Sequence, residues 1–236
     1  GSGAPKFLNF MKGELFPFVE ANYRVSNTNR TLAGCSLGGL FTLYTLYKEP
    51  QLFQGYIAAS PAYQGYTDLF TKLENEYYQS NITNPARLYM TIGGVERSAT
   101  DFERFSGYLK SRNYKSLKIE TRVIENTGHS GTKGEGFARG LQYVYARPKL
   151  KLPSSTLRKY TGEYQTEGGQ AVILALENDQ PILSYPGSAK IELQVASENE
   201  WYSTGEFLNL NFVNKEGNHG VEMATYGRTQ FLKKMK

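Results

Sequence analysis

The stretch Arg30-Thr31-Leu32-Ala33-Gly34-Cys35-Ser36-Leu37-Gly38-Gly39-Leu40 decides the fold, because it joins a short strand to a helix through a glycine-flanked turn. Within it, residues 34–38 fit the Gly-x-Ser-x-Gly pattern of a nucleophile elbow. The small neighbours let adjacent elements approach closely, and the serine stands at the apex of a strained turn. The plainer interpretation is a glycine-rich connection with an ordinary capping serine. A catalytic role for Ser36 therefore depends on the rest of the chain.

The position of Ser36 places its hydroxyl at the N-terminus of the helix that follows. There the helix dipole and the free backbone amides favour developing negative charge. We expect the amide of Leu37 to be one donor of an oxyanion pocket.

The first part of the chain alternates helical and strand-like patterns, which predicts a parallel sheet covered by helices and an α/β fold class. The helices expected from apolar spacing are 5–23, 40–47, 102–113 and 137–145. The expected strands are 30–34, 56–60, 87–92 and 117–124. The pattern of the aromatic-rich insertion at 66–86 does not define its path.

Candidates for a base and an acid follow the third and fourth expected strands. His129 lies in a glycine-rich loop after the fourth strand, where parallel sheets place binding and catalytic groups. Glu96 comes just past the third strand, and the order serine, acid, histidine is that of a hydrolase triad. Asp101 and Glu103 are nearby alternatives for the acid, although Asp101 also suits the N-terminus of the next helix. We predict Ser36 as nucleophile, His129 as base and Glu96 as acid.

Beyond Pro148 the pattern changes to short strand-like runs separated by turn clusters. We expect a helix-and-sheet domain at 1–148, a linker at 149–155, and a small all-β domain at 156–236, built as an antiparallel barrel or sandwich. The strand-like runs in this second domain are 172–176, 191–195, 207–212, 221–225 and 230–233.

Composition narrows the classes of function. Mean hydropathy is −0.50, and no run approaches the roughly 20 apolar residues that cross a bilayer, so no membrane span is expected. The net charge is +5, but the basic residues are scattered singly along the chain. We therefore expect them to lie on a solvated surface and not to form a nucleic-acid interface. With one cysteine and two histidines, neither a disulfide framework nor a metal cluster is expected, and the chemistry needs no cofactor.

The segment from Phe7 to Tyr63, with the 30–41 stretch and Ser60-Pro61, resembles the esterase D / enterochelin-esterase-like branch of the α/β-hydrolases. Gly128-His129 and the helix at 137–145 are similar to the base loop and final helix of that family. The resemblance covers residues 4–147 and implies a partial α/β-hydrolase sheet with flanking helices. The segment 157–164 resembles the lipocalin-like β module that bacterial hydrolases often carry after the catalytic domain.

The resemblance implies serine-dependent hydrolysis of carboxylic esters, such as siderophore, feruloyl or acetyl esters, with acyl transfer as the alternative on the same fold. The expected substrate is a small-molecule or glycan-linked ester. A periplasmic or extracellular location is favoured over a cytoplasmic one.

Strands that precede the first helix in that family are missing here, so the domain at 1–148 is expected to be N-terminally incomplete. The strand before Ser36 would then have an open apolar edge. Homo-oligomerisation, or pairing with the missing N-terminal segment, is expected at this edge. A non-catalytic fragment that binds a carbohydrate or a partner protein is the remaining alternative.

Overall fold

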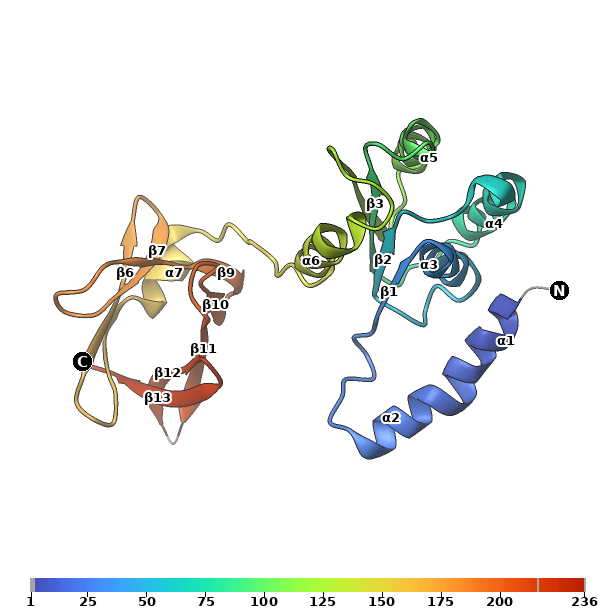
Figure 1. The fold of residues 1–236 in the computed structure, drawn as a ribbon. Helices are drawn as coiled ribbons and strands as arrows, with labels where there is room; N and C mark the ends of the chain where they lie inside the picture. Colours follow the sequence, from blue (N-terminus) through green and yellow to red (C-terminus); the bar gives the residue numbers. More distant parts are fainter. Residues whose placement is uncertain (1–2, 216, 236) are drawn as a thin grey trace. The chain divides into compact units, whose positions relative to one another are not determined.

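The computed structural model describes residues 3–215 and 217–235, and the chain divides into two compact units, Gly1–Ala146 and Arg147–Lys236. Figure 1 shows the first unit in blue to yellow-green and the second in yellow to red. The first unit combines helices with a parallel sheet, and the second is almost entirely β, which confirms the predicted fold class. No helix within the described ranges is both long and apolar enough to cross a membrane.

In the described part of the first unit, a four-stranded parallel sheet has the order β1-β2-β3-β4. Its strands are β1 (Thr31–Cys35), β2 (Gly55–Ala59), β3 (Ala86–Gly93) and β4 (Leu117–Ile124). Neighbouring strands are aligned at their carboxyl ends, because Cys35 pairs with Ala59 and Ala59 pairs with Thr91. The carboxyl ends of the strands therefore meet at one edge of the sheet, where Ser36 follows β1.

Helices cover both faces of this sheet (Figure 1). They are α3 (Leu37–Lys48), α4 (Thr67–Gln79) and α5 (Ala99–Ser111) on one face, and α6 (Thr132–Val144) on the other. Successive side chains of a strand point to opposite faces, so Tyr56 and Ala58 of β2 pack into the core with α3 to α5, whereas Ile57 faces α6. All five residues of β2 are buried, as in a central parallel strand.

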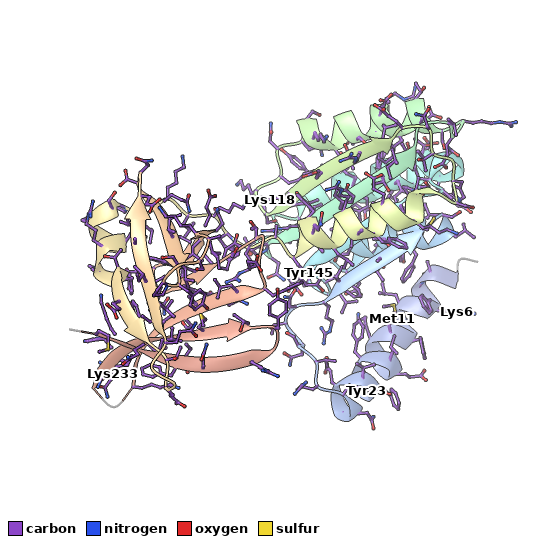
Figure 2. The ribbon with its side chains drawn as sticks, turned by 60° about the vertical axis from the view of Figure 1, so that its left-hand side comes forward. Lys6, Met11, Tyr23, Lys118, Tyr145 and Lys233 are labelled. Atoms are coloured by element: carbon purple, nitrogen blue, oxygen red, sulfur yellow. The ribbon has the colours of Figure 1, made fainter. Side chains whose placement is uncertain are left out.

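The N-terminal helical segment consists of α1 (Gly3–Phe10), a π-helical stretch Met11–Leu15 and α2 (Phe16–Asn22). The sequence predicts one helix over 5–23. The chain stays helical there but changes its hydrogen bonding just before Pro17, which has no amide hydrogen to donate. Met11, labelled with Tyr23 in Figure 2, is buried, whereas the Tyr23 side chain is 63% exposed.

Helix α4 occupies the insertion whose path the sequence leaves undefined. It turns Phe70 and Tyr77 into the core, and it also buries Glu74 completely. The Glu74 carboxylate pairs with Arg112 at 2.9 Å and accepts hydrogen bonds from the hydroxyls of Tyr108 and Tyr114. A buried carboxylate is stable only with such partners, so this cluster fixes α4 against α5 and the segment that follows it.

The second unit, within the described residues, is a nine-stranded antiparallel sheet with the order β8-β7-β6-β5-β13-β12-β11-β10-β9. The strands are β5 (Gly162–Gln165), β6 (Ala171–Glu177), β7 (Gln180–Ser184), β8 (Ile191–Glu192), β9 (Gln194–Ser197), β10 (Glu200–Tyr202), β11 (Leu208–Lys215), β12 (Asn218–Thr225) and β13 (Arg228–Lys234). The two edge strands, β8 and β9, are separated in the chain by Leu193 alone. The sheet therefore curls into a nearly closed barrel around Trp201, which is fully buried.

The segment expected to be a linker, 149–155, makes its contacts inside the second unit. The Leu150 amide donates to the Val195 carbonyl at 2.8 Å, and Ser154 begins the short helix α7 (Ser154–Leu157). Just before this segment, the Arg147 guanidinium pairs with the Glu200 carboxylate at 2.8 Å. These contacts hold the chain to the barrel from residue 147 onward.

Replacing Gly140 of α6 by alanine should destabilise the first unit, because a Cβ there would lie 2.5 Å from Cγ2 of Ile57. We expect the free energy of unfolding to fall by about 1–3 kcal/mol, as in other overpacked interiors. Gly107→Ala is the matched control: a Cβ at this exposed position of α5 meets nothing within 4 Å. This control should raise the free energy of unfolding by about 0.5–1 kcal/mol, because alanine is favoured over glycine within a helix. Urea unfolding compares the two variants, and equal stabilities would contradict the close packing of α6 on β2.

Candidate active site

Ser36 lies between the end of β1 and the first residue of α3, with φ 58° and ψ −118°. A positive φ is uncommon for a residue with a side chain and stores backbone strain. The turn is tight because a Cβ on Gly34 would lie 2.2 Å from the carbonyl carbon of Gly38. Packing therefore requires a glycine at position 34, and the chain must turn at the serine.

Backbone hydrogen bonds fix this turn. The Ser36 amide donates to the Ala59 carbonyl at 3.0 Å, and the Ser36 carbonyl accepts from the Ala62 amide at 3.1 Å. The Ser36 amide is thus already used within the fold. The Leu37 amide lies in the first turn of α3, where a helix offers no internal acceptor, so it is available to an anion.

The Glu96 carboxylate accepts hydrogen bonds on both oxygens just beyond β3. Its Oε1 accepts from the Gly93 amide at 2.8 Å and from the Ser60 hydroxyl at 2.6 Å. Its Oε2 lies 2.7 Å from Nδ1 of His129. Asp101 pairs instead with Arg104 on α5. Of the acids considered from the sequence, Glu96 is the one that contacts the histidine.

His129 stands in the turn between β4 and α6. This turn packs on the Glu96 loop because Gly93 has no side chain: a Cβ there would lie 2.1 Å from the carbonyl oxygen of Thr127. The Val95 amide donates to the same oxygen at 3.2 Å. When the proton of the neutral imidazole is on Nδ1, facing Glu96, Nε2 is free to accept another. The imidazole is 48% exposed, so a substrate can reach it.

The nucleophile and base candidates lie at the same edge of the sheet. Within residues 3–215 and 217–235, no hydrogen bond joins the Ser36 hydroxyl to the His129 ring, which is bonded to Glu96. Such contacts are often long in a free enzyme and tighten when substrate binds. Thr132, three residues beyond His129, lies close enough to Cys35, the residue before the serine, for its hydroxyl to lower the pKa of the Cys35 thiol. The turn that carries His129 and the turn that carries Ser36 are therefore close neighbours.

The electrostatics of the acid favour its charged form. Burial raises the pKa of the Glu96 carboxyl, but hydrogen bonds from Ser60, His129 and the Gly93 amide outweigh burial and hold the pKa below its ordinary value. An ionised Glu96 can orient the imidazole and stabilise the imidazolium. Burial also raises the pKa of the Cys35 thiol, so Cys35 is a neutral packing group and not a second nucleophile.

Ser60 and Thr132 are the site residues that sequence reasoning missed. Both side chains are buried, and Ser60 Oγ lies 2.8 Å from Thr132 Oγ1. Thr132 Oγ1 also donates to the His129 carbonyl at 2.9 Å. The available signal for Ser60 is its place in the sequence, since it directly follows β2 at the edge where the other site residues gather.

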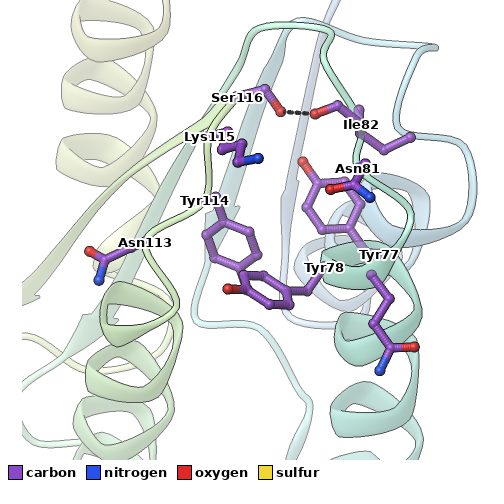
Figure 3. A pocket seen from close by; sticks show the side chains of 9 residues that line it. Tyr77, Tyr78, Asn81, Ile82, Asn113, Tyr114, Lys115 and Ser116 are labelled. Atoms are coloured by element: carbon purple, nitrogen blue, oxygen red, sulfur yellow. Dashed lines mark hydrogen bonds between the residues drawn. The ribbon is translucent and has the colours of Figure 1, made fainter.

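A separate cavity of about 330 Å³ lies at the opposite edge of the sheet (Figure 3). The rings of Tyr77, Tyr78 and Tyr114 line it, and the Ser116 hydroxyl donates to the Ile82 carbonyl beside it. Ser116 directly precedes β4, so this cavity adjoins the starts of the strands and not the candidate triad. Within the described ranges, no group of three or more His, Cys, Asp or Glu residues could hold a metal ion.

Comparison with known proteins identifies the family. Residues 1–126 match the family model described as "Putative esterase". The chain belongs to this esterase family. The matched region includes Ser36 and Glu96 and stops shortly before His129.

This chain has curated relatives over part of its length. The ferri-bacillibactin esterase BesA of Bacillus subtilis is 32% identical over 97 residues, which are 40% of this chain and 34% of that protein. The siderophore enterobactin esterase of Emericella nidulans is 45% identical over 62 residues, 25% of this chain and 20% of that protein. The chain therefore matches about a third of the first relative and a fifth of the second.

Solved structures share the fold of part of this chain. The BES protein from Bacillus cereus has a TM-score of 0.57 at 27% identity, with 60% of this chain and 55% of that chain covered. An IroE-like serine hydrolase from Shewanella oneidensis has a TM-score of 0.56 at 22% identity, with 66% and 53% covered. This chain thus spans little more than half of those chains.

Replacing Glu96 by glutamine should make the stability of the protein less sensitive to acid. Because its folded pKa is depressed, ionised Glu96 contributes stability above the ordinary value of 4.5, and this contribution is lost as the pH falls through the folded pKa. At neutral pH we expect the free energy of unfolding of the wild type to exceed that of Glu96→Gln by about 1–3 kcal/mol. Urea unfolding across the acid range should show this gap narrowing below pH 4.5. A gap that widens on acidification would contradict the depressed pKa.

Proposed function

We propose that this protein hydrolyses carboxylic esters through an acyl-serine intermediate on Ser36. The observation that carries the proposal is the 2.7 Å contact between Glu96 Oε2 and His129 Nδ1, formed at the sheet edge where Ser36 stands on a strained turn. Membership of the esterase family supports the same reaction class. An acid that orients a histidine at the same edge of the sheet as a half-buried serine is the arrangement that can activate a hydroxyl for acyl transfer.

In the proposed reaction, Ser36 Oγ bonds to the acyl carbon while its proton passes to His129 Nε2. The carbonyl electrons move to oxygen, and the resulting oxyanion is stabilised by the Leu37 amide and the N-terminus of α3. Collapse of this intermediate breaks the ester C–O bond, and the leaving alkoxide takes the proton from the imidazolium. Water then repeats the sequence, releasing the acid and restoring Ser36.

We propose siderophore esters as the substrate class. The names of the bacterial and fungal relatives, which are siderophore esterases, support this choice. A cleft of about 250 Å³ at the same edge of the sheet supports it further, since aromatic rings and polar groups share its lining. Tyr63 of this cleft directly follows Ala62, whose amide bonds to the Ser36 carbonyl. A ligand with rings and hydroxyl or carbonyl groups fits such a lining.

Ser36→Ala should abolish ester hydrolysis, because no other group replaces the attacking hydroxyl. We expect kcat for p-nitrophenyl acetate to fall roughly 10⁴-fold or more, and hydrolysis of a siderophore ester to fall in parallel. Ser106→Ala is the matched control, since Ser106 is a buried serine of α5 whose hydroxyl has no hydrogen-bond partner within the described ranges. Full activity in Ser36→Ala would disprove the mechanism.

A further inference from the structure

We propose that Ser60 and Thr132 are positioning residues, which hold the acid Glu96 and the turn of the base His129 in the geometry that ester hydrolysis requires. The proposal rests on the proposed function and adds two buried hydroxyls to the groups that it needs. Each acts through a neighbouring residue and not on the substrate.

Ser60 restrains the acid. Its hydroxyl donates to Glu96 Oε1 at 2.6 Å, and the Gly93 amide donates to the same oxygen at 2.8 Å. Two donors on one oxygen oppose rotation of the carboxylate about its last side-chain bond. Oε2 is thereby kept on His129 Nδ1, 2.7 Å away. Without the Ser60 hydroxyl, Oε1 would retain the Gly93 amide and the carboxylate could turn.

The backbone at Ser60 is strained in a way that serves this contact. Ser60 has a φ of 42°, directly after β2, and its amide donates to the Thr91 carbonyl at 2.7 Å. Glycine would adopt this conformation at lower cost. The position instead carries a side chain that is 2% exposed and whose hydroxyl reaches the acid. Strain that persists at a site in this way is a sign of a functional constraint.

Thr132 connects Ser60 to the base. Each hydroxyl has a single proton, and the Ser60 proton is given to the ionised Glu96 carboxylate. The Thr132 proton is therefore shared between Ser60 Oγ at 2.8 Å and the His129 carbonyl at 2.9 Å. A closed ring, Ser60–Glu96–His129–Thr132, results. It ties the ends of β2 and β3 to the start of α6, so the acid and the base cannot shift independently.

The test measures kcat and KM for p-nitrophenyl acetate in variants of the whole chain. Ser60→Ala and Thr132→Val should each lower kcat roughly 10- to 100-fold, with KM changed less than about twofold, because misplaced catalytic groups affect the transition state more than substrate binding. Thr132→Ser keeps the hydroxyl and should stay within about threefold of wild type. Ser106→Ala, a buried serine outside the ring, should match wild type.

Ser60→Gly separates positioning from stability. Glycine relieves the positive φ, so this variant should unfold at a higher urea concentration than Ser60→Ala. Because both variants lack the hydroxyl, both should be equally slow. If Ser60 were only structural, the more stable variant would be the more active, and that result would overturn the proposal.

The proton on His129 Nδ1 gives a readout that does not need activity. Its far-downfield proton resonance reports the contact with Glu96, and His219→Gln removes the other histidine and secures the assignment. The resonance should move upfield in Ser60→Ala and persist in Ser106→Ala. An unchanged resonance and an unchanged kcat in Ser60→Ala and Thr132→Val would reject the proposal. If the wild-type chain shows the resonance but hydrolyses no ester, the proposed function is refuted. The positioning roles of Ser60 and Thr132 are then decided by the resonance alone.

Discussion

Gly34 has no room for a side chain, because a Cβ there would lie 2.2 Å from the carbonyl carbon of Gly38. That contact makes β1 turn sharply into α3 and leaves Ser36 at the apex with a φ of 58°. The serine then stands above the carboxyl edge of the sheet, at the N-terminus of a helix, where a developing oxyanion is favoured. The rest of the candidate site can be assembled only because this turn is so tight.

Parallel strands supply the other groups at the same edge. Gly93, at the end of β3, lets the Thr127 carbonyl approach, so the loops after β3 and β4 lie on each other. Glu96 and His129 meet as a consequence, and the same convergence brings Ser60 against the acid. Close backbone approach at glycines thus produces the hydrogen bonds that lower the pKa of the acid.

The sequence predicts the sheet and the candidate triad because both follow from local pattern: strand, glycine turn, helix, and loops after strands. It favours Glu96 over Asp101 because Asp101 falls inside a helix start, and in the structure Asp101 pairs with Arg104. Ser60 and Thr132 could not be predicted, since a buried hydroxyl is recognised only by its partners across 36 and 72 residues of chain. The sequence does not predict helix α4, because the buried Glu74 breaks its apolar face. It does not predict β5 and β10, which are only four and three residues long, or β7, which Pro181 interrupts.

The measurement that tests the central claim most directly is the intact mass of the protein after exposure to a fluorophosphonate, with the modified peptide identified. Such reagents label a serine only when a base activates it. Our account predicts one adduct, on Ser36, which is lost in Ser36→Ala and forms far more slowly in His129→Gln. The absence of an adduct, or an adduct on another serine that survives Ser36→Ala, would contradict it.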